Sequence, residues 1–449
     1  MSSEWVQTVL GDICSIQNGY IQTGPFGSQL HTSDYKEIGV PVVMPTNIGV
    51  NGISQEGIAR VDERDVERLA QHKLEIGDIV FSRRGDVTKN ALVRDSESGW
   101  LCGTGCLKVR LGVEQIANSK FISYYLRSPD IKDWLVRHAV GATMPNLNTG
   151  ILSAVPITLP PLQIQHYVAE VLGVLDDRII LLRQSNETLE SIAQAIFKSW
   201  FVDFDPVRAK MEGRHPEGMD DATAALFPDS FEESELGLVP KGWRVEPIKD
   251  VIDTLGGATP STKDETFWVP GEFHWATPKD LSGAASPILF DTARSISELG
   301  LAKISSGLLP SGTLLMSSRA PIGYLSICQI PVAINQGCIA MPPGGKLPPL
   351  FMYFWCKTNM NLIKEHANGS TFMEISKKSF RPIPILVPTD VVLKAFINFG
   401  QALFDKISVN AEQADILASI RDTLLPRLIS GQLRLPALDQ GPEGVEIVD

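Results

Sequence analysis

The chain has 449 residues, of which 43% are hydrophobic and 20% are charged, and its formal net charge is −12. These values are typical of a folded protein of two or three domains, and they exclude a wholly disordered or collagen-like chain. The acidic excess by itself argues against a nucleic-acid-binding protein.

The negative charge is, however, concentrated in two segments. Residues 202–240 contain ten acidic and three basic residues, and residues 437–449 contain four acidic residues and no basic one. The rest of the chain is therefore close to neutral. A near-neutral domain can carry a basic groove, so DNA binding stays among the open functions.

Neither a membrane-spanning segment nor a signal peptide is predicted. No apolar run approaches the roughly 18–20 residues that cross a bilayer, and the first residues lack a basic region followed by an apolar one. The six cysteines form no C-x-x-C pair. We therefore expect a cytoplasmic protein with free thiols.

Residues 1–158, which we call the first head, are rich in turns and short strand-like runs such as residues 78–81, with a helical stretch near 121–136. This pattern predicts an α+β domain built on a short-stranded, twisted sheet. Polar loop residues could read DNA, since Arg suits guanine and Asn suits adenine. For any single one, a solvated or capping role is the alternative. The candidates are Gln22, Ser28, Gln29, Thr46, Asn47, Arg83, Arg84, Lys89 and Asn90.

Residues 159–201 are expected to form a long helix that starts after Pro160-Pro161. Its apolar positions alternate steps of four and three residues, which is the heptad pattern of a coiled coil. The one Asn among them is typical of a residue that fixes pairing register. The predicted core positions are Val168, Leu172, Leu175, Ile179, Leu182, Asn186, Leu189, Ala193, Ile196 and Trp200.

An acidic linker, residues 202–241, leads to residues 242–388, the second head, which repeats the first. Matched motifs include GDIVFSRR (77–84) with GTLLMSSR (312–319), Gly105-Cys106 with Gly337-Cys338, PTNI (45–48) with PKDL (278–281), and GAT (141–143) with GST (369–371). Two long repeats indicate two similar domains. The second set of DNA-contact candidates is Lys279, Asp280, Ser317, Ser318, Arg319, Asn335, Gln336, Lys377, Lys378 and Arg381.

Residues 389–431 repeat the helix, and residues 432–449 form an acidic tail. The second heptad pattern is weaker, because Gly400 and Arg421 interrupt it. Either each helix packs only on its own head, or the two pair as an antiparallel coiled coil, which we prefer because their stripes are equally long. The second predicted core is Phe396, Gly400, Leu403, Ile407, Asn410, Ala414, Leu417, Arg421, Leu424 and Leu428.

Two unlike heads on a stiff spacer suit a ligand with two separated sites. Forty helical residues would span about 60 Å, and the major groove of DNA faces one side about every 34–36 Å. DNA is therefore the natural ligand for such a protein.

Five segments give the chain a resemblance to a known family: LPPLQIQ (159–165), LGVLDDRI (172–179), IFKSWFVDFDPVRAKMEGRHPEGM (196–219), ALFPDSFEESELGLVPKGW (225–243) and LLPRLISGQLRL (424–435). The chain resembles the specificity (S, or HsdS) subunits of type I restriction–modification systems. The resemblance covers essentially the whole chain.

The resemblance implies two target recognition domains, each reading one half of a bipartite, asymmetric DNA site, and an antiparallel coiled coil that sets the spacer. It also implies that two modification subunits dock along the helices and that restriction subunits join them. S-adenosylmethionine, ATP and Mg²⁺ would be bound by those partners, and no cofactor or metal by this chain.

Motifs for catalysis are missing from the sequence. Gly344-Gly345-Lys346 is followed by Leu347 and lacks the spacing of a phosphate-binding loop. The seven histidines form no H-E-x-x-H pair, and Asp34-Tyr35-Lys36 has no partner acid for a nuclease site. We therefore expect no catalytic residue. The alternatives are a coiled-coil adaptor that binds only proteins, and a stand-alone nuclease or methyltransferase.

Overall fold

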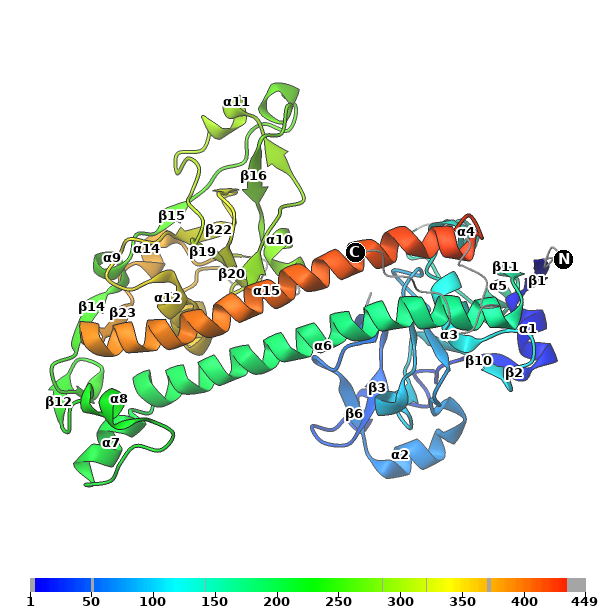
Figure 1. The fold of residues 1–449 in the computed structure, drawn as a ribbon, viewed down its shortest axis with the longest axis horizontal. Helices are drawn as coiled ribbons and strands as arrows, with labels where there is room; N and C mark the ends of the chain where they lie inside the picture. Colours follow the sequence, from blue (N-terminus) through cyan, green and yellow to red (C-terminus); the bar gives the residue numbers. More distant parts are fainter. Residues whose placement is uncertain are drawn as a thin grey trace, which may run out of the picture. The chain divides into compact units, whose positions relative to one another are not determined.

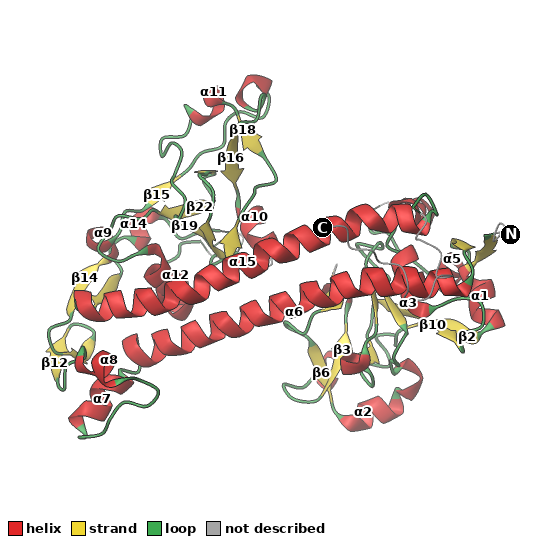
Figure 2. Ribbon diagram, in the orientation of Figure 1, coloured by secondary structure: helices red, strands yellow, loops and turns green. Residues whose placement is uncertain are grey.

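The computed structural model describes residues 5–49, 52–141, 143–284, 286–319, 321–369 and 373–433 (Figures 1 and 2). The chain forms two compact units. The first comprises the residues up to Ile180 together with those from Ile416 onward, and the second is Leu181–Asp415. Each unit contains one head and a part of each long helix. Most of the predicted acidic tail, residues 434–449, lies outside the described residues.

The first head is built on short sheets. Its four-stranded sheet has the order β2-β10-β7-β8, a second sheet has the order β6-β3-β9, and β1 pairs with β11 where the chain enters and leaves the head. The strands are β1 (Val6–Val9), β2 (Asn18–Thr23), β3 (Val40–Val43), β6 (Ala59–Val61), β7 (Ile79–Ser82), β8 (Asn90–Leu92), β9 (Leu101–Cys102), β10 (Cys106–Gly112) and β11 (Pro156–Leu159). β4 (Ile48–Gly49) pairs with β5 (Gly52–Ile53).

The second head has the same plan with one more strand, β17, at the edge of its largest sheet, in the order β15-β22-β19-β20-β17. Its second sheet is β18-β16-β21, and β14 pairs with β23. The strands are β14 (Arg244–Pro247), β15 (Leu255–Gly256), β16 (Phe273–Ala276), β17 (Ile288–Leu289), β18 (Ser295–Ile296), β19 (Leu314–Ser317), β20 (Leu325–Cys328), β21 (Ala333–Ile334), β22 (Cys338–Met341) and β23 (Pro384–Val387).

The strand registers confirm that the two heads are repeats of one fold. Motifs that match in sequence pair with one another in the same register in both heads. The equivalent pairs are Cys106 with Ser82 and Cys338 with Ser317, Val43 with Cys102 and Ala276 with Ile334, and Val6 with Leu159 and Arg244 with Val387. The predicted α+β class with two similar domains is therefore confirmed.

The helical stretch that we predicted near residues 121–136 is two shorter helices, and so is its counterpart in the second head. In the first head these are α3 (Ser119–Tyr125) and α4 (Pro129–His138), and in the second α12 (Pro349–Thr358) and α13 (Met360–Glu365). Pro129 stands at the first turn of α4, where its missing N–H costs nothing, and it prevents α3 from continuing. The remaining helices of the heads are α1 (Leu10–Ile16), α2 (Glu63–Arg68), α5 (Thr149–Ser153), α9 (Ile248–Val251), α10 (Pro278–Gly283), α11 (Glu298–Leu301) and α14 (Lys377–Phe380).

The two long helices are α6 (Leu162–Phe201) and α15 (Asp390–Ile429). In the first unit, Leu172 of α6 and Leu425 of α15 belong to one core with Phe121 of the first head. The helix stripes are therefore covered both by each other and by the head, rather than by the head alone. No helix of the described residues is long and apolar enough to cross a membrane.

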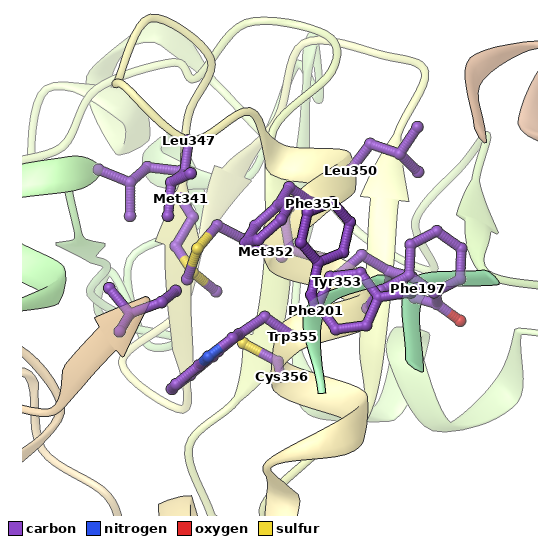
Figure 3. Close-up of a cluster of buried hydrophobic side chains, with 14 of the residues drawn as sticks. Phe197, Phe201, Met341, Leu347, Leu350, Phe351, Met352, Tyr353, Trp355 and Cys356 are labelled. Atoms are coloured by element: carbon purple, nitrogen blue, oxygen red, sulfur yellow. The ribbon is translucent and has the colours of Figure 1, made fainter. Parts of the chain in front are cut away.

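The core of the second unit is aromatic (Figure 3). The ring centroid of Phe396 on α15 lies 5.6 Å from that of Phe197 and 5.1 Å from that of Phe201, both on α6. Phe351 of α12 lies 5.0 Å from Phe201 in an edge-to-face arrangement. Gly400, an expected interruption of the heptad, is buried, and a Cβ there would lie 3.3 Å from the Leu350 side chain of the head.

Each unit also buries one polar pair between the helices, and in both units the helices run antiparallel. In the second unit, the Asn410 amide donates to Asn186 Oδ1 at 2.9 Å, and Asn186 donates to the Ile407 carbonyl. In the first unit, Arg421 donates to Asp176 Oδ1 at 2.7 Å. Arg421, the second expected interruption, is therefore an ion-pair partner in the helix interface.

The acidic linker has secondary structure of its own. It contains α7 (Asp205–Met211), α8 (Asp221–Ala225) and a hairpin of β12 (Phe231–Ser234) and β13 (Gly237–Pro240). Val207 and Phe227 of this segment are buried in the core of the second unit. All six cysteines are free and buried.

The ion pair predicts a stability effect that can be measured. Asp176 is 3% exposed. Its carboxylate pairs with Arg421, accepts a hydrogen bond from the Tyr124 hydroxyl at 2.8 Å and lies 3.6 Å from Arg127. Asp176→Asn should lower the free energy of unfolding by about 3–5 kcal/mol, because it removes the buried carboxylate that pairs with Arg421 and Arg127. Chemical denaturation would measure it. The control is Asp177→Asn, which changes the exposed neighbour and should cost little; equal losses in both variants would contradict the argument.

Candidate nucleic-acid interface

The matched motifs of the first head meet at the end of β7. The Arg83 N–H donates to the Gly105 carbonyl at 2.8 Å, and the Leu147 N–H donates to the Arg83 carbonyl at 2.9 Å. Arg84 forms an isolated β-bridge with Asn146. Three loops that are far apart in the sequence are thus joined by their backbones at the arginine pair.

The second head builds the same junction at the end of β19. The Ser318 N–H donates to the Gly337 carbonyl at 2.8 Å, and the Ile375 N–H donates to the Ser318 carbonyl at 2.9 Å. Arg319 forms a β-bridge with Glu374. The arginine that recurs in the sequence therefore occupies the same place in both heads. Ala142, Ser370 and Thr371 of the matched turns lie outside the described residues.

The fourth pair of motifs completes the junction. A Cβ at Gly105 would lie 3.3 Å from Pro45 Cγ, and one at Gly337 would lie 2.9 Å from Pro278 Cγ. Gly105 also has a φ of +87°, which favours glycine. The glycines therefore allow the proline loops to approach, and this brings Thr46 and Lys279 beside the arginine loops.

The two junctions differ in their side chains. Arg84 is exposed and faces a neutral partner strand residue, Asn146. Arg319 Nη1 lies 4.0 Å from Glu374 Oε1, and both side chains are about half exposed, at 40% and 47%. The first junction thus offers an exposed arginine opposite a neutral amide, whereas the second offers a cation beside a carboxylate. Such differences are what two different ligand sequences require.

Several candidates in the first head have structural roles. Asn47 is buried and its Oδ1 accepts the Met44 N–H at 3.0 Å, while the buried Asn90 donates to the Leu126 carbonyl. We therefore remove both from the candidate interface, because neither amide is available to a ligand. Gln29 Oε1 accepts the Phe26 N–H at 3.0 Å. The candidates that keep accessible side chains are Gln22, Ser28, Thr46, Arg83, Arg84 and Lys89.

The same correction applies to the second head. Ser317 is buried and its hydroxyl accepts the Tyr324 N–H, and Ser318 is also buried. Asp280 accepts the N–H groups of Thr277 and Ala293, both at 2.8 Å. Two further candidates are tied to neighbouring residues: Asn335 accepts the Gly337 N–H, and Arg381 donates to the hydroxyl and carbonyl of Thr254. The side chains that stay accessible belong to Lys279, Arg319, Gln336, Lys377 and Lys378.

The structure adds residues that sequence reasoning missed. Asn146 and Glu374 join the arginine loops. Each lies five residues after the matched glycine, Gly141 or Gly369, so extending that motif pair would have matched them. Arg294 stacks on Trp268, with Cζ 3.5 Å from the ring centroid. The exposed ring of Phe26 lies beside Arg83. Nothing in the sequence separates these two aromatic residues from core residues.

The thiols that follow the junction glycines stay protonated. Burial raises the pKa of the Cys106 and Cys338 thiols far above neutrality, so neither is a thiolate at neutral pH. Among the described residues, no group of three or more His, Cys, Asp or Glu side chains could hold a metal ion. What the junctions present is arginine, lysine and amide groups on rigid loops.

Comparisons with known proteins agree with the repeat. A family model described as "Type I restriction modification DNA specificity domain" matches residues 2–191 and again residues 240–393. The HindI specificity subunit of Haemophilus influenzae is 25% identical over 414 residues, which cover 82% of this chain and 89% of that protein. The MjaIX specificity subunit of Methanocaldococcus jannaschii is 33% identical over 192 residues, or 42% of this chain and 44% of that one.

A solved structure shares the fold. The type I restriction–modification S subunit from M. genitalium aligns with 95% of this chain and 96% of its own, with a TM-score of 0.54 and 18% sequence identity. At that identity the likeness concerns the fold alone.

Proposed function

The chain belongs to the type I restriction–modification DNA specificity family, and we propose that its two heads read the two halves of one bipartite, asymmetric DNA site. As a specificity subunit it selects the DNA sequence and is not itself catalytic. The adaptor and the stand-alone enzyme gain no support, because the relatives described above are all specificity subunits.

One observation carries the proposal of two half-sites. Both heads build the same backbone junction, but they place different side chains on it: Arg83 and Arg84 in the first, Ser318, Arg319 and Glu374 in the second. A shared frame with different side chains suits two different base sequences. A protein that bound only the DNA backbone would need no such difference.

The exposed cations divide into two proposed roles. Arg84 and Arg319 extend from rigid backbone junctions and have the planar donor group that reads guanine. Lys89, Lys279, Lys377 and Lys378 are exposed and carry point charges, and we assign them to phosphate contacts, which position the duplex without reading sequence.

The long helices are proposed to set the separation of the half-sites. α6 and α15 each continue without interruption from one compact unit into the other. The polar pairs Asp176–Arg421 and Asn186–Asn410 support a fixed register, because a shift would leave buried polar groups unpaired.

We further propose that two modification subunits dock along these helices and that restriction subunits join them. Several large apolar side chains of α6 and α15 face solvent, among them Val174, Leu181, Val409, Ile416 and Ile420. Exposed apolar groups on paired helices suit protein partners. S-adenosylmethionine, ATP and Mg²⁺ are assigned to those partners and not to this chain.

Removing either junction arginine should relax one half-site. Arg84→Ala and Arg319→Ala should each cost roughly 1–3 kcal/mol of discrimination at one position, in different halves. Methylation-site profiles of the complex with its modification subunits measure this. Arg64→Ala and Arg244→Ala, which change exposed arginines away from the junctions, serve as controls and should leave the profiles unchanged.

Exchanging one head should exchange one half-site. A chain in which residues 1–158 come from a relative of different specificity should methylate sites with one altered half and one original half, because the second head is unchanged. Sequencing of the methylated sites would show it. Alteration of both halves would contradict independent reading by the two heads.

Shortening both helices should shorten the spacer. Deleting residues 178–184 and 413–419 removes one heptad from each helix and retains both buried polar pairs. Seven helical residues correspond to about 10 Å, so the spacer should contract by about three base pairs. Deleting only residues 178–184 is the control and should impair folding, because the two stripes no longer match. An unchanged spacer in the double deletion would refute the proposal.

A further inference from the structure

Phe26 of the first head is an exposed aromatic ring. It is 55% exposed, although the residues on either side of its loop, Gly24 and Leu30, are buried. A large apolar side chain in such a place loses the stabilisation that burial would give it. The ring is therefore open to contact with a ligand.

The ring is exposed at a fixed position. The Gly24 N–H donates to the Cys106 carbonyl at 2.9 Å, which ties the loop to β10. The Phe26 carbonyl accepts the Gln29 N–H at 2.8 Å, and the Phe26 N–H is bound by the Gln29 side chain. Arg68 Nη1 donates to the Gln29 carbonyl on the other side. These bonds close a tight turn, so the exposure of Phe26 is built into the loop.

Phe26 belongs to the same surface as the arginine loop. Arg83 Cζ lies 5.9 Å from the centre of the Phe26 ring, which is within the range of a cation–π contact. The backbone of Arg83 is held at the junction by Gly105 and Leu147. Arg83 Nε is buried and has no hydrogen-bond partner among the residues that the structure describes. An apolar group and a cation thus stand together on the proposed DNA-binding face.

We propose that Phe26 is a specificity-determining residue that contacts the 5-methyl group of a thymine in the half-site read by the first head. The inference rests on the proposed function. The thymine methyl is the apolar group that base edges present in the major groove, and Phe is one of the side chains that suit it. The ring is 55% exposed, which leaves enough of it free for a contact at the groove surface.

The test combines a protein change with a DNA change. The complex of the full chain with its modification subunits is titrated with duplexes that carry the methylated site, in which each thymine is replaced in turn by deoxyuridine. One replacement should weaken binding of the unaltered protein about fourfold, the effect of one buried carbon. Phe26→Ala should weaken binding to the thymine duplex at least as much and should be insensitive to that replacement. Phe26→Leu should bind the thymine duplex almost as tightly as the unaltered protein and should regain most of the sensitivity to deoxyuridine.

Three outcomes would overturn the inference: a first half-site without any A·T pair, no sensitive thymine, or a sensitive thymine whose effect persists in Phe26→Ala. Ile38→Ala, which changes another exposed apolar residue of the same unit, serves as the control and should bind like the unaltered protein. Arg84→Ala distinguishes a failure of this inference from a failure of the proposed function. If Arg84→Ala weakens binding while Phe26→Ala does not, only the role of Phe26 fails; if neither matters, reading of DNA by the first head fails.

Discussion

The antiparallel pairing of α6 with α15 is the interaction on which the rest of the structure depends. An apolar stripe alone tolerates a shift of one turn, because leucine packs against leucine in either register. The buried carboxylate of Asp176 does not, since it must meet Arg421. The same carboxylate also accepts the Tyr124 hydroxyl of the first head. One buried charge therefore aligns the helices with each other and with the head that they carry.

In the second unit, other side chains hold the two helices in register and attach the head to them. There the register is held by the Asn186–Asn410 pair and the head by aromatic rings of α12 against Phe197, Phe201 and Phe396. Tyr353 and Lys357 of α12 both donate to Glu190 of α6 at the edge of this core. The positions that weaken the second heptad are thus the places where other groups enter: Leu350 against Gly400, and Asp176 against Arg421.

Sequence reasoning located the long helices and the repeated motifs because both signals extend over many residues. A forty-residue heptad pattern excludes most alternatives, and motif pairs in the same order in both heads identify equivalent loops. Sequence reasoning could not predict the orientation of single polar side chains. Asn47, Asn90 and Ser317 look like binding residues in the sequence, but they bond to backbone groups nearby, as amides and hydroxyls in turns often do. Phe26 is the reverse case: a lone aromatic residue normally predicts a core position, but this side chain is exposed.

The junction at Gly105 and Pro45 has an evolutionary consequence. Its loops are joined by main-chain hydrogen bonds, so the side chains of Arg84 and Asn146 can be replaced without disrupting the junction. Point mutations of those residues could then change the recognised sequence with little effect on folding. Mutations of the supporting glycine and proline would disrupt the junction and be removed by selection. A protein under selection for a new target sequence could therefore change a few residues and keep the rest of its structure.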